Sequence, residues 1–174
     1  MLVARVIASN DTRAFGELIQ RHQSQIRNFL RRLTRDESQA DDLAQDAFMH
    51  AWNKIDSYSG RGSFIGWLLK VAYTTFLQSK RKRDRYDEVL KQVGNEGGSV
   101  EYASASDEIS DLDRFLAVLN EQERAVMIMS YACGLSHREI HEATELPTGT
   151  IKSIIYRAKD KIRESFDIEH HQHG

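Results

Sequence analysis

The segment GLSHREIHEATELPTGTIKSIIYRAKDKIRE, Gly134–Glu164, decides the fold of the second half of the chain. An S-x-x-E pattern that begins at Ser136 typically starts a helix and predicts a short one over residues 137–144. Pro147, the only proline, interrupts the pattern before a longer basic helix predicted over 148–166. A short helix, a tight turn and a longer basic helix are together typical of a helix-turn-helix.

The rest of the chain also has helical character. Asn120 and Glu123 form an N-x-x-E start like that of a capping box, which predicts a helix that runs through Tyr131 and ends at Gly134. Apolar residues recur at helical spacing, and no stretch alternates with the period of two that a strand shows. Further helices are predicted near residues 2–9, 12–33, 38–53 and from Ser63 onward. The predicted fold class is therefore all-α.

The stretch GNEGGSVEYASASDEIS, residues 94–110, is rich in glycine, serine and acidic residues and has little apolar periodicity. This composition predicts a flexible acidic linker. The linker divides the chain of 174 residues into two small helical domains, residues 1–93 and 111–174. A chain of this length suits either one medium domain or two small ones that each bury a core.

The net charge of −2 hides a segregation of charge along the chain. Residues 94–113 contain no lysine or arginine, whereas basic residues gather in KRKRDR, Lys80–Arg85, and along the last predicted helix. A single basic cluster is more often a solvated helix face. Two clusters in separate segments favour a polyanion such as DNA, because lysine and arginine displace the counterions condensed on phosphates.

Several classes of protein are excluded by composition. The single cysteine, Cys133, cannot close an intramolecular disulfide and is more typical of a small buried apolar residue than of a nucleophile. The chain lacks an HExxH pair and a phosphate-binding glycine-rich loop, so no catalytic residue, metal site or cofactor is predicted. No apolar run approaches the roughly 18 residues that a membrane-spanning helix needs, and the N-terminus does not resemble a signal peptide. We therefore expect a cytoplasmic protein that does not insert into the membrane.

Two segments of the chain resemble parts of one known protein family. Gly134–Glu164 resembles the promoter-reading helix-turn-helix of the extracytoplasmic-function (ECF) group of bacterial RNA polymerase sigma factors. Independently, ADDLAQDAFMHAW, Ala40–Trp52, followed by FIGWLLKVAYTTFLQSKRKR, Phe64–Arg83, resembles that group's domain for binding core polymerase and melting promoters. The two matches occur in the family's order and cover nearly the whole chain. The resemblance implies an alternative sigma factor that directs promoter-specific initiation, reading the −10 element with the first domain and the −35 element with the second.

The resemblance also implies roles for three sets of residues. Core-polymerase binding is expected from a helix face opposite the apolar stripe, at Asp42, Gln45, Asp46 and Met49. Contact with −10 DNA and capture of the opened strand are expected from Asp56, Ser57, Tyr58, Ser59, Arg61, Lys70, Tyr73, Thr74, Lys80, Arg81 and Arg83. Contact with −35 DNA is expected from Thr148, Thr150, Lys152, Ser153, Tyr156 and Arg157. Trp52 and Trp67 are expected in the core rather than as stacking platforms.

The implied partners are core RNA polymerase, promoter DNA and an anti-sigma factor. In the family, the contacts on polymerase are the coiled coil of the largest subunit and the flap. A protein of this kind associates with the nucleoid when bound to polymerase, and its anti-sigma factor could hold it at the membrane.

Some positions depart from the family's usual pattern. Ile154 stands where the family frequently has a basic residue. We therefore expect Ile154 either to contact a thymine methyl group or to form plain apolar surface. His141 replaces a small residue. Glu145 replaces a glycine-like turn residue, where a positive φ would cost a side chain free energy. Thr74 and Gln78 replace the usual asparagine and aspartate, so the −10 sequence cannot be copied from relatives.

Two alternatives from other classes stay open on the sequence alone. A stand-alone helix-turn-helix repressor or activator would bind DNA without polymerase and would need a dimer interface or a ligand pocket in the first domain. An inhibitor or adaptor that binds a sigma factor or polymerase would not need two basic helices. The acidic face and the basic helix of the first domain favour the sigma factor.

Overall fold

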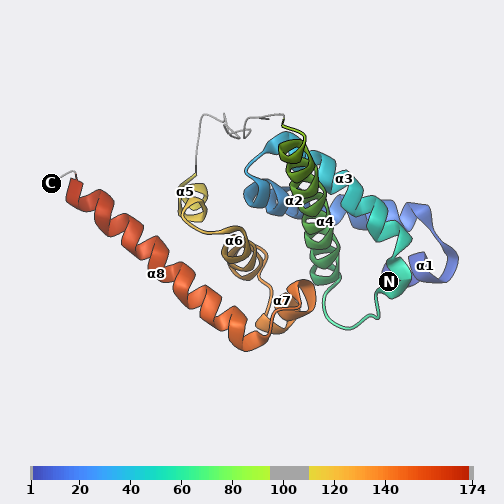
Figure 1. The fold of residues 1–174 in the computed structure, drawn as a ribbon. Helices are drawn as coiled ribbons and strands as arrows, with labels where there is room; N and C mark the ends of the chain where they lie inside the picture. The colour runs from blue at the N-terminus through green and yellow to red at the C-terminus, as the bar shows by residue number, and fades with distance from the viewer. Residues whose placement is uncertain (1, 95–109, 173–174) are drawn as a thin grey trace.

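The computed structural model describes residues 2–94 and 110–172, with side chains described to residue 167. Within these ranges every regular element is helical, which confirms the all-α prediction (Figure 1). The α-helices are α1 (Leu2–Ser9), α2 (Thr12–Thr34), α3 (Glu37–Asn53), α4 (Phe64–Gln92), α5 (Asp111–Ala117), α6 (Glu121–Met127), α7 (His137–Thr144) and α8 (Thr148–Gln172). A 3-10 turn, η1 (Ile55–Ser57), follows α3, and a π turn, η2 (Ile128–Ala132), extends α6. The expected linker, residues 94–110, lies almost wholly outside the described residues.

Polar side chains cap the starts of the helices where the sequence predicts them. Asn120 and Ser136 each accept a hydrogen bond from the backbone N–H three residues on, and the carboxylates of Glu123 and Glu139 accept one from the backbone N–H of Asn120 and Ser136. Both predicted capping boxes are therefore confirmed. Ser63 caps α4 in the same way by accepting a hydrogen bond from the Gly66 N–H at 3.1 Å. These caps satisfy N–H groups that a helix start leaves without an internal partner.

The first four helices build the platform for the loop after α3. Helices α2, α3 and α4 pack on one another, and α1 lies against α2 and η1. The core between them contains large residues of α2 and α4 and small residues of α3, among them Phe29, Leu30, Leu68, Ala44 and Ala47. Small side chains on α3 allow its two neighbours to approach closely, and this fixes where the following loop begins.

The last four helices contain the predicted helix-turn-helix, which is formed by α7 and α8. Helices α6 and α7 both pack on α8, which leads away from the rest of the molecule toward the C-terminus (Figure 1). Because two helices cover it, the buried face of α8 is wide: Ile154 is 1% exposed and Ile155 is 8% exposed. The expectation that Ile154 lies at the surface is therefore wrong. Helix α8 also runs past the predicted end at Phe166, since no proline or glycine interrupts residues 167–172.

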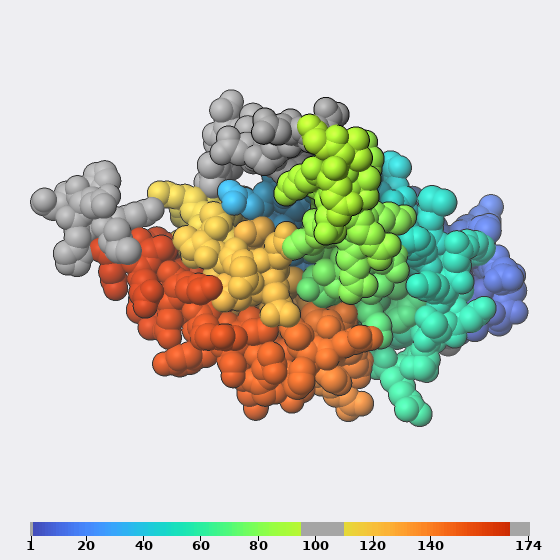
Figure 2. Space-filling view, viewed as in Figure 1, coloured from blue at the N-terminus to red at the C-terminus, as the bar shows by residue number. Residues whose placement is uncertain are grey.

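The two groups of helices share one continuous apolar core. Helix α7 packs on α4, and α2 contacts α6 and η2. In the space-filling view the yellow-to-red atoms of the second group lie directly against the green atoms of α4 (Figure 2). This contact brings α7 onto the first turns of α4, directly after the loop that follows α3.

The turn of the helix-turn-helix holds a strained residue. Glu145 ends α7 in the left-handed conformation with φ of 63°, as the sequence anticipates for this glycine-like position. A side chain in the left-handed conformation costs about 1–2 kcal/mol of folding free energy. Glycine would remove this cost, but it also makes the unfolded chain more flexible, which cancels part of the gain in stability. We expect Glu145→Gly to stabilise the protein by about 0.5–1 kcal/mol in urea unfolding.

The matched control for this prediction is Glu164→Gly, which makes the same chemical change on the exposed part of α8. There the backbone is right-handed, so glycine should destabilise the protein by about 1 kcal/mol. Equal effects of the two substitutions would mean that the left-handed turn at Glu145 stores no strain.

Candidate nucleic-acid interface

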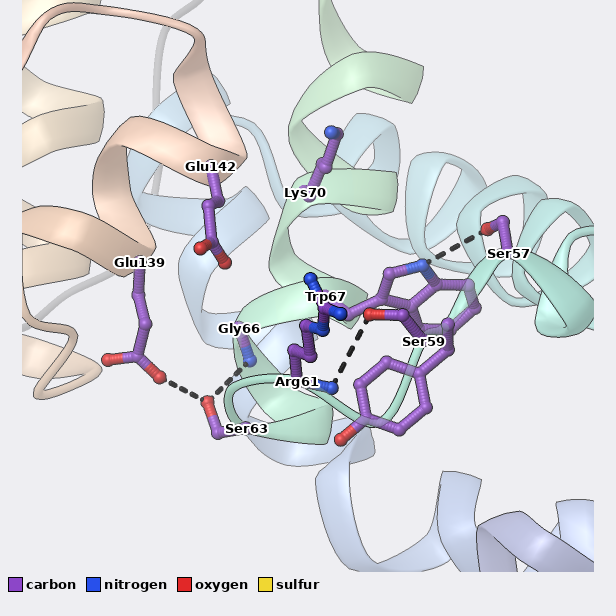
Figure 3. A pocket seen from close by; sticks show the side chains of 10 residues that line it. Ser57, Ser59, Arg61, Ser63, Gly66, Trp67, Lys70, Glu139 and Glu142 are labelled. Atoms are coloured by element: carbon purple, nitrogen blue, oxygen red, sulfur yellow. Dashed lines mark hydrogen bonds between the residues drawn. The ribbon is translucent and has the colours of Figure 1, made fainter.

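A cavity of about 230 Å³ lies where the loop after α3 meets the start of α4 and helix α7 (Figure 3). The loop and α4 contribute small hydroxyl groups, two aromatic rings and two cations, and α7 contributes two carboxylates. Its lining residues are Ser57, Tyr58, Ser59, Arg61, Ser63, Gly66, Trp67, Lys70, Glu139 and Glu142. The cavity thus combines hydrogen-bonding groups, stacking surface and positive charge in one place.

Side-chain hydrogen bonds hold the loop in shape. The Trp67 Nε1–H donates to the Ser57 hydroxyl at 3.3 Å, and the Tyr58 hydroxyl donates to the Gly62 carbonyl at 3.0 Å. The Tyr58 ring lies 5.8 Å from the Trp67 ring and 5.6 Å from that of Phe64, centroid to centroid. Rings at these separations attract one another, so the loop presents a rigid aromatic edge to the cavity.

The structure brings nearly half of the predicted −10 residues together at this cavity. Five of the eleven line it, namely Ser57, Tyr58, Ser59, Arg61 and Lys70. Thr74 lies one turn beyond Lys70 and lines a second cavity of about 290 Å³ between α3 and α4. Asp56 is exposed but belongs to neither cavity, and Lys80, Arg81 and Arg83 lie farther along α4.

Tyr73 is buried, contrary to the expectation that it lies off the apolar stripe of α4. It is 7% exposed, and its ring stacks on that of Phe76 with a centroid separation of 6.3 Å. Burial, and then the negative charge of Glu121, raise the pKa of Tyr73. The start of α6 therefore lies close to this face of α4. The apolar periodicity of α4 alone predicts that this face is exposed.

The predicted −35 residues all lie exposed on α8. These residues, Thr148, Thr150, Lys152, Ser153, Tyr156 and Arg157, face away from the buried isoleucines, and Tyr156 is 69% exposed.

Lys161 anchors α8 to α6, because its Nζ lies 2.7 and 2.8 Å from the two carboxylate oxygens of Glu123. Burial acts to raise the pKa of Glu123, but the hydrogen bonds from Lys161 and the Asn120 N–H lower it overall.

The predicted polymerase-binding residues share one exposed face of α3. Asp42, Gln45, Asp46 and Met49 are all exposed, on the side opposite the buried Leu43 and Ala47. Met49 is 65% exposed, so this face offers an apolar side chain beside its two charges. Two carboxylates beside one apolar side chain suit a partner helix that carries basic residues.

Three residues at the cavity are functional candidates that sequence reasoning missed. Trp67 packs against the apolar core, as predicted, but it is only half-buried and also lines the cavity. Glu139 accepts a hydrogen bond from the Ser63 hydroxyl at 2.6 Å, which lowers the pKa of its carboxyl group, and Glu142 faces the same space (Figure 3). Ser63 and Glu139 are 76 positions apart, so no local pattern could reveal the contact.

Three further observations bear on other kinds of site or segment. Burial raises the pKa of Cys133 to about 11, so its thiol stays protonated at neutral pH. Within the described ranges, no three potential metal ligands among histidine, cysteine, aspartate and glutamate come together. No helix in those ranges is long and apolar enough to cross a membrane.

Two family models match the chain. Residues 18–86 match the model described as Sigma-70 region 2, and residues 109–162 match the model described as Sigma-70, region 4. The first match covers the loop after α3 and α4 as far as Tyr86, and the second covers α7 and α8 as far as Ile162.

Curated relatives match along most of their length. The chain is 32% identical over 158 residues to the ECF RNA polymerase sigma factor RpoE of Cereibacter sphaeroides, which covers 88% of this chain and 87% of the relative. It is 28% identical over 175 residues to the ECF RNA polymerase sigma-E factor of Escherichia coli strain K12, with 93% and 91% covered.

Solved structures show the same arrangement of helices. The sigma factor RpoE of Bartonella quintana, solved in complex with the anti-sigma factor NepR, matches with a TM-score of 0.72 and 29% identity, covering 88% of this chain and 97% of that one. CnrH, solved in complex with the cytosolic domain of CnrY, matches in fold with a TM-score of 0.69 and 23% identity, covering 96% of each chain.

Proposed function

The chain belongs to the extracytoplasmic-function group of the sigma-70 family, and from that premise we propose which of its surfaces carries each step of promoter recognition. It directs promoter-specific transcription initiation by RNA polymerase, with the −10 element read by region 2 and the −35 element by region 4. A sigma factor is an initiation factor and not by itself a catalytic enzyme. We assign region 2 to residues 1–93 and region 4 to residues 111–174.

The cavity beside the loop captures a base of the opened strand. This assignment is supported by the convergence of loop hydroxyl groups, the Tyr58 and Trp67 rings, and the cations of Arg61 and Lys70 on one space. A base that leaves the stack is held by stacking on aromatic rings and by hydrogen bonds to its edges, while cations hold the flanking phosphates. The remaining predicted −10 residues, Asp56, Thr74, Lys80, Arg81 and Arg83, extend this surface along the loop and α4.

Helix α8 reads the −35 element in the major groove. Its exposed face carries Lys152, Ser153 and Arg157, whose side chains can donate to base edges or phosphates. Thr148 and the N–H groups of the first turn can hold a phosphate. Thr150 and Tyr156 complete the face.

We expect Arg157→Ala to weaken promoter binding by the polymerase complex about 5- to 100-fold, the range for the loss of one specific contact. Binding of the free chain to core polymerase should not change, because Arg157 lies on α8, away from the acidic face of α3. Filter binding of promoter DNA and co-purification with core would measure the two. Equal loss of both would show that Arg157 acts through folding.

We also propose that an anti-sigma factor binds the protein when it is not bound to polymerase. The support is that a structural relative of 29% identity was solved in complex with the anti-sigma factor NepR. The protein is then placed in the cytoplasm, on the nucleoid when polymerase-bound or at the membrane when an anti-sigma factor tethers it. Affinity purification of the chain from its own host, before and after stress, tests whether such a partner is bound and released.

The deciding experiment is run-off transcription on fragmented genomic DNA with core polymerase, with and without the protein. New transcripts from discrete sites only in its presence would establish initiation specificity, and their upstream sequences would define both elements. If no transcript appears and the protein alone binds discrete DNA fragments in a mobility-shift assay, the protein is instead a stand-alone regulator that binds DNA without polymerase.

A further inference from the structure

A histidine at the end of α3 lines the second cavity, the one of about 290 Å³ between α3 and α4. His50 lies half-buried in the last turn of α3. Its ring Nδ1 is 3.0 Å from the hydroxyl oxygen of Thr75 on α4, 25 positions away in sequence. Thr75 is 5% exposed, so this contact holds the ring from its buried side.

The hydrogen bonds of Thr75 determine which ring nitrogen of His50 carries the proton. The Thr75 hydroxyl has a single hydrogen, which it donates to the Val71 carbonyl at 2.9 Å. Toward His50 it can therefore only accept, and the donor must be the Nδ1–H of the ring. In a neutral imidazole the other nitrogen, Nε2, is then an acceptor. No described residue forms a hydrogen bond with Nε2, so this acceptor is available to a ligand in the cavity.

The cavity that His50 lines adjoins the one proposed to capture a base. Ser57, Trp67 and Lys70 line both cavities, which therefore share a wall. Lys54 and Lys70 are exposed at the second cavity, where their long side chains can reach the phosphates of a strand. A strand whose base enters the first cavity thus has a neighbouring nucleotide within reach of the second.

An acceptor at this place distinguishes the bases by one group. Adenine and cytosine carry an amino group, N6 or N4, at the position where guanine and thymine carry a carbonyl oxygen. The amino group can donate to Nε2, whereas a carbonyl oxygen would place two acceptors against each other and leave both unsatisfied. Thr74 and Gln78 also line the cavity, but hydroxyl and amide groups can both donate and accept. The fixed polarity therefore comes from His50.

We propose that His50 is a specificity-determining residue of the −10 surface, whose Nε2 selects adenine or cytosine for the nucleotide next to the captured base. Thr75 is a positioning residue that acts through His50, because its hydroxyl holds the ring and fixes the tautomer. The inference rests on the function proposed above and deepens it by naming the class of base that the second cavity accepts.

The first test concerns the ring itself and needs neither polymerase nor DNA. Nitrogen NMR of the full chain at about pH 8, where free imidazole side chains are neutral, distinguishes a protonated ring nitrogen from an unprotonated one. We expect the His50 signals, identified by their loss in His50→Gln, to show a proton on Nδ1 and none on Nε2. Thr75→Ser should preserve this tautomer, and Thr75→Val should not. A proton on Nε2 in the unaltered chain would overturn the proposal.

The second test measures base preference in transcription. Core polymerase and the full chain transcribe a promoter found by run-off transcription, with each position of its −10 element randomised in turn. We expect one position to prefer adenine or cytosine over guanine or thymine by about 5- to 100-fold. His50→Lys, whose side chain can only donate, should reverse the preference at that position alone.

The matched control is Asn53→Lys, which adds the same charge at an exposed position of α3 outside both cavities. It should leave every base preference unchanged, and both lysine variants should still co-purify with core polymerase, which excludes misfolding. An unchanged preference in His50→Lys, or the same reversal in Asn53→Lys, would overturn the role of His50. Absence of any transcript with the unaltered chain would instead count against the proposed function.

Discussion

Substituting Arg124 by alanine is expected to lower the free energy of unfolding by about 2–4 kcal/mol, because three buried carbonyl groups lose a charged hydrogen-bond donor. Arg124 is 8% exposed, and its guanidinium donates to three carbonyls, those of Leu33, Leu116 and Leu119, at 2.8–3.2 Å. Alanine removes this donor from the Leu33 and Leu119 carbonyls, leaves the Leu116 carbonyl only its backbone donor, the Leu119 N–H at 3.3 Å, and leaves a cavity besides. Urea unfolding followed by circular dichroism measures the loss.

The control for Arg124 is Arg163→Ala. Arg163 pairs with Asp160 on the surface of α8, where its side chain is 70% exposed. Exposed pairs of this kind contribute at most about 1 kcal/mol. If the two substitutions cost the same, water must reach the three carbonyls in solution, and Arg124 would not be a structural link between α2 and α6.

Local chemistry made most of the fold predictable. The capping patterns at Asn120 and Ser136 begin helices because their partners lie only three residues away. The left-handed turn at Glu145 was predicted from the family resemblance, which places a glycine-like residue there, and it too depends only on the local backbone. Signals of this kind involve neighbours in sequence, so packing elsewhere in the chain does not override them.

Periodicity alone could not predict which helix faces stay open. An apolar stripe shows that a helix packs on something, but not how many neighbours cover it. Ile154 is buried because α6 and α7 both pack on α8, and Tyr73 is buried where α4 lies close to the start of α6. The same limit applies to the cavity: its loop residues were predicted from one short segment, whereas Glu139 and Glu142 reach it only through the contact of α7 with α4.

Replacing Asp42 and Asp46 together by lysine is expected to weaken binding to core polymerase about a hundredfold or more. Both carboxylates are exposed on α3 beside Met49, and no hydrogen bond or ion pair in the described residues depends on them. Their reversal therefore leaves the fold intact. At an interface, losing one partner of a close charge pair costs about 2–5 kcal/mol, and reversal adds repulsion. A hundredfold change needs only about 2.7 kcal/mol.

The measurement for this double variant is co-purification with core polymerase at two salt concentrations, beside Glu17→Lys and Glu164→Lys as a control with the same change of net charge. Long-range attraction to polymerase would be reduced equally in both variants and would be screened by salt, because the Debye length is about 8 Å at physiological ionic strength. If Asp42 and Asp46 contact polymerase directly, only the Asp42/Asp46 variant loses that contact. Added salt then screens the repulsion from the new lysines and restores its binding to polymerase only in part. If both variants co-purify equally well, polymerase must bind a different face, and the exposed Met49 would then need another partner.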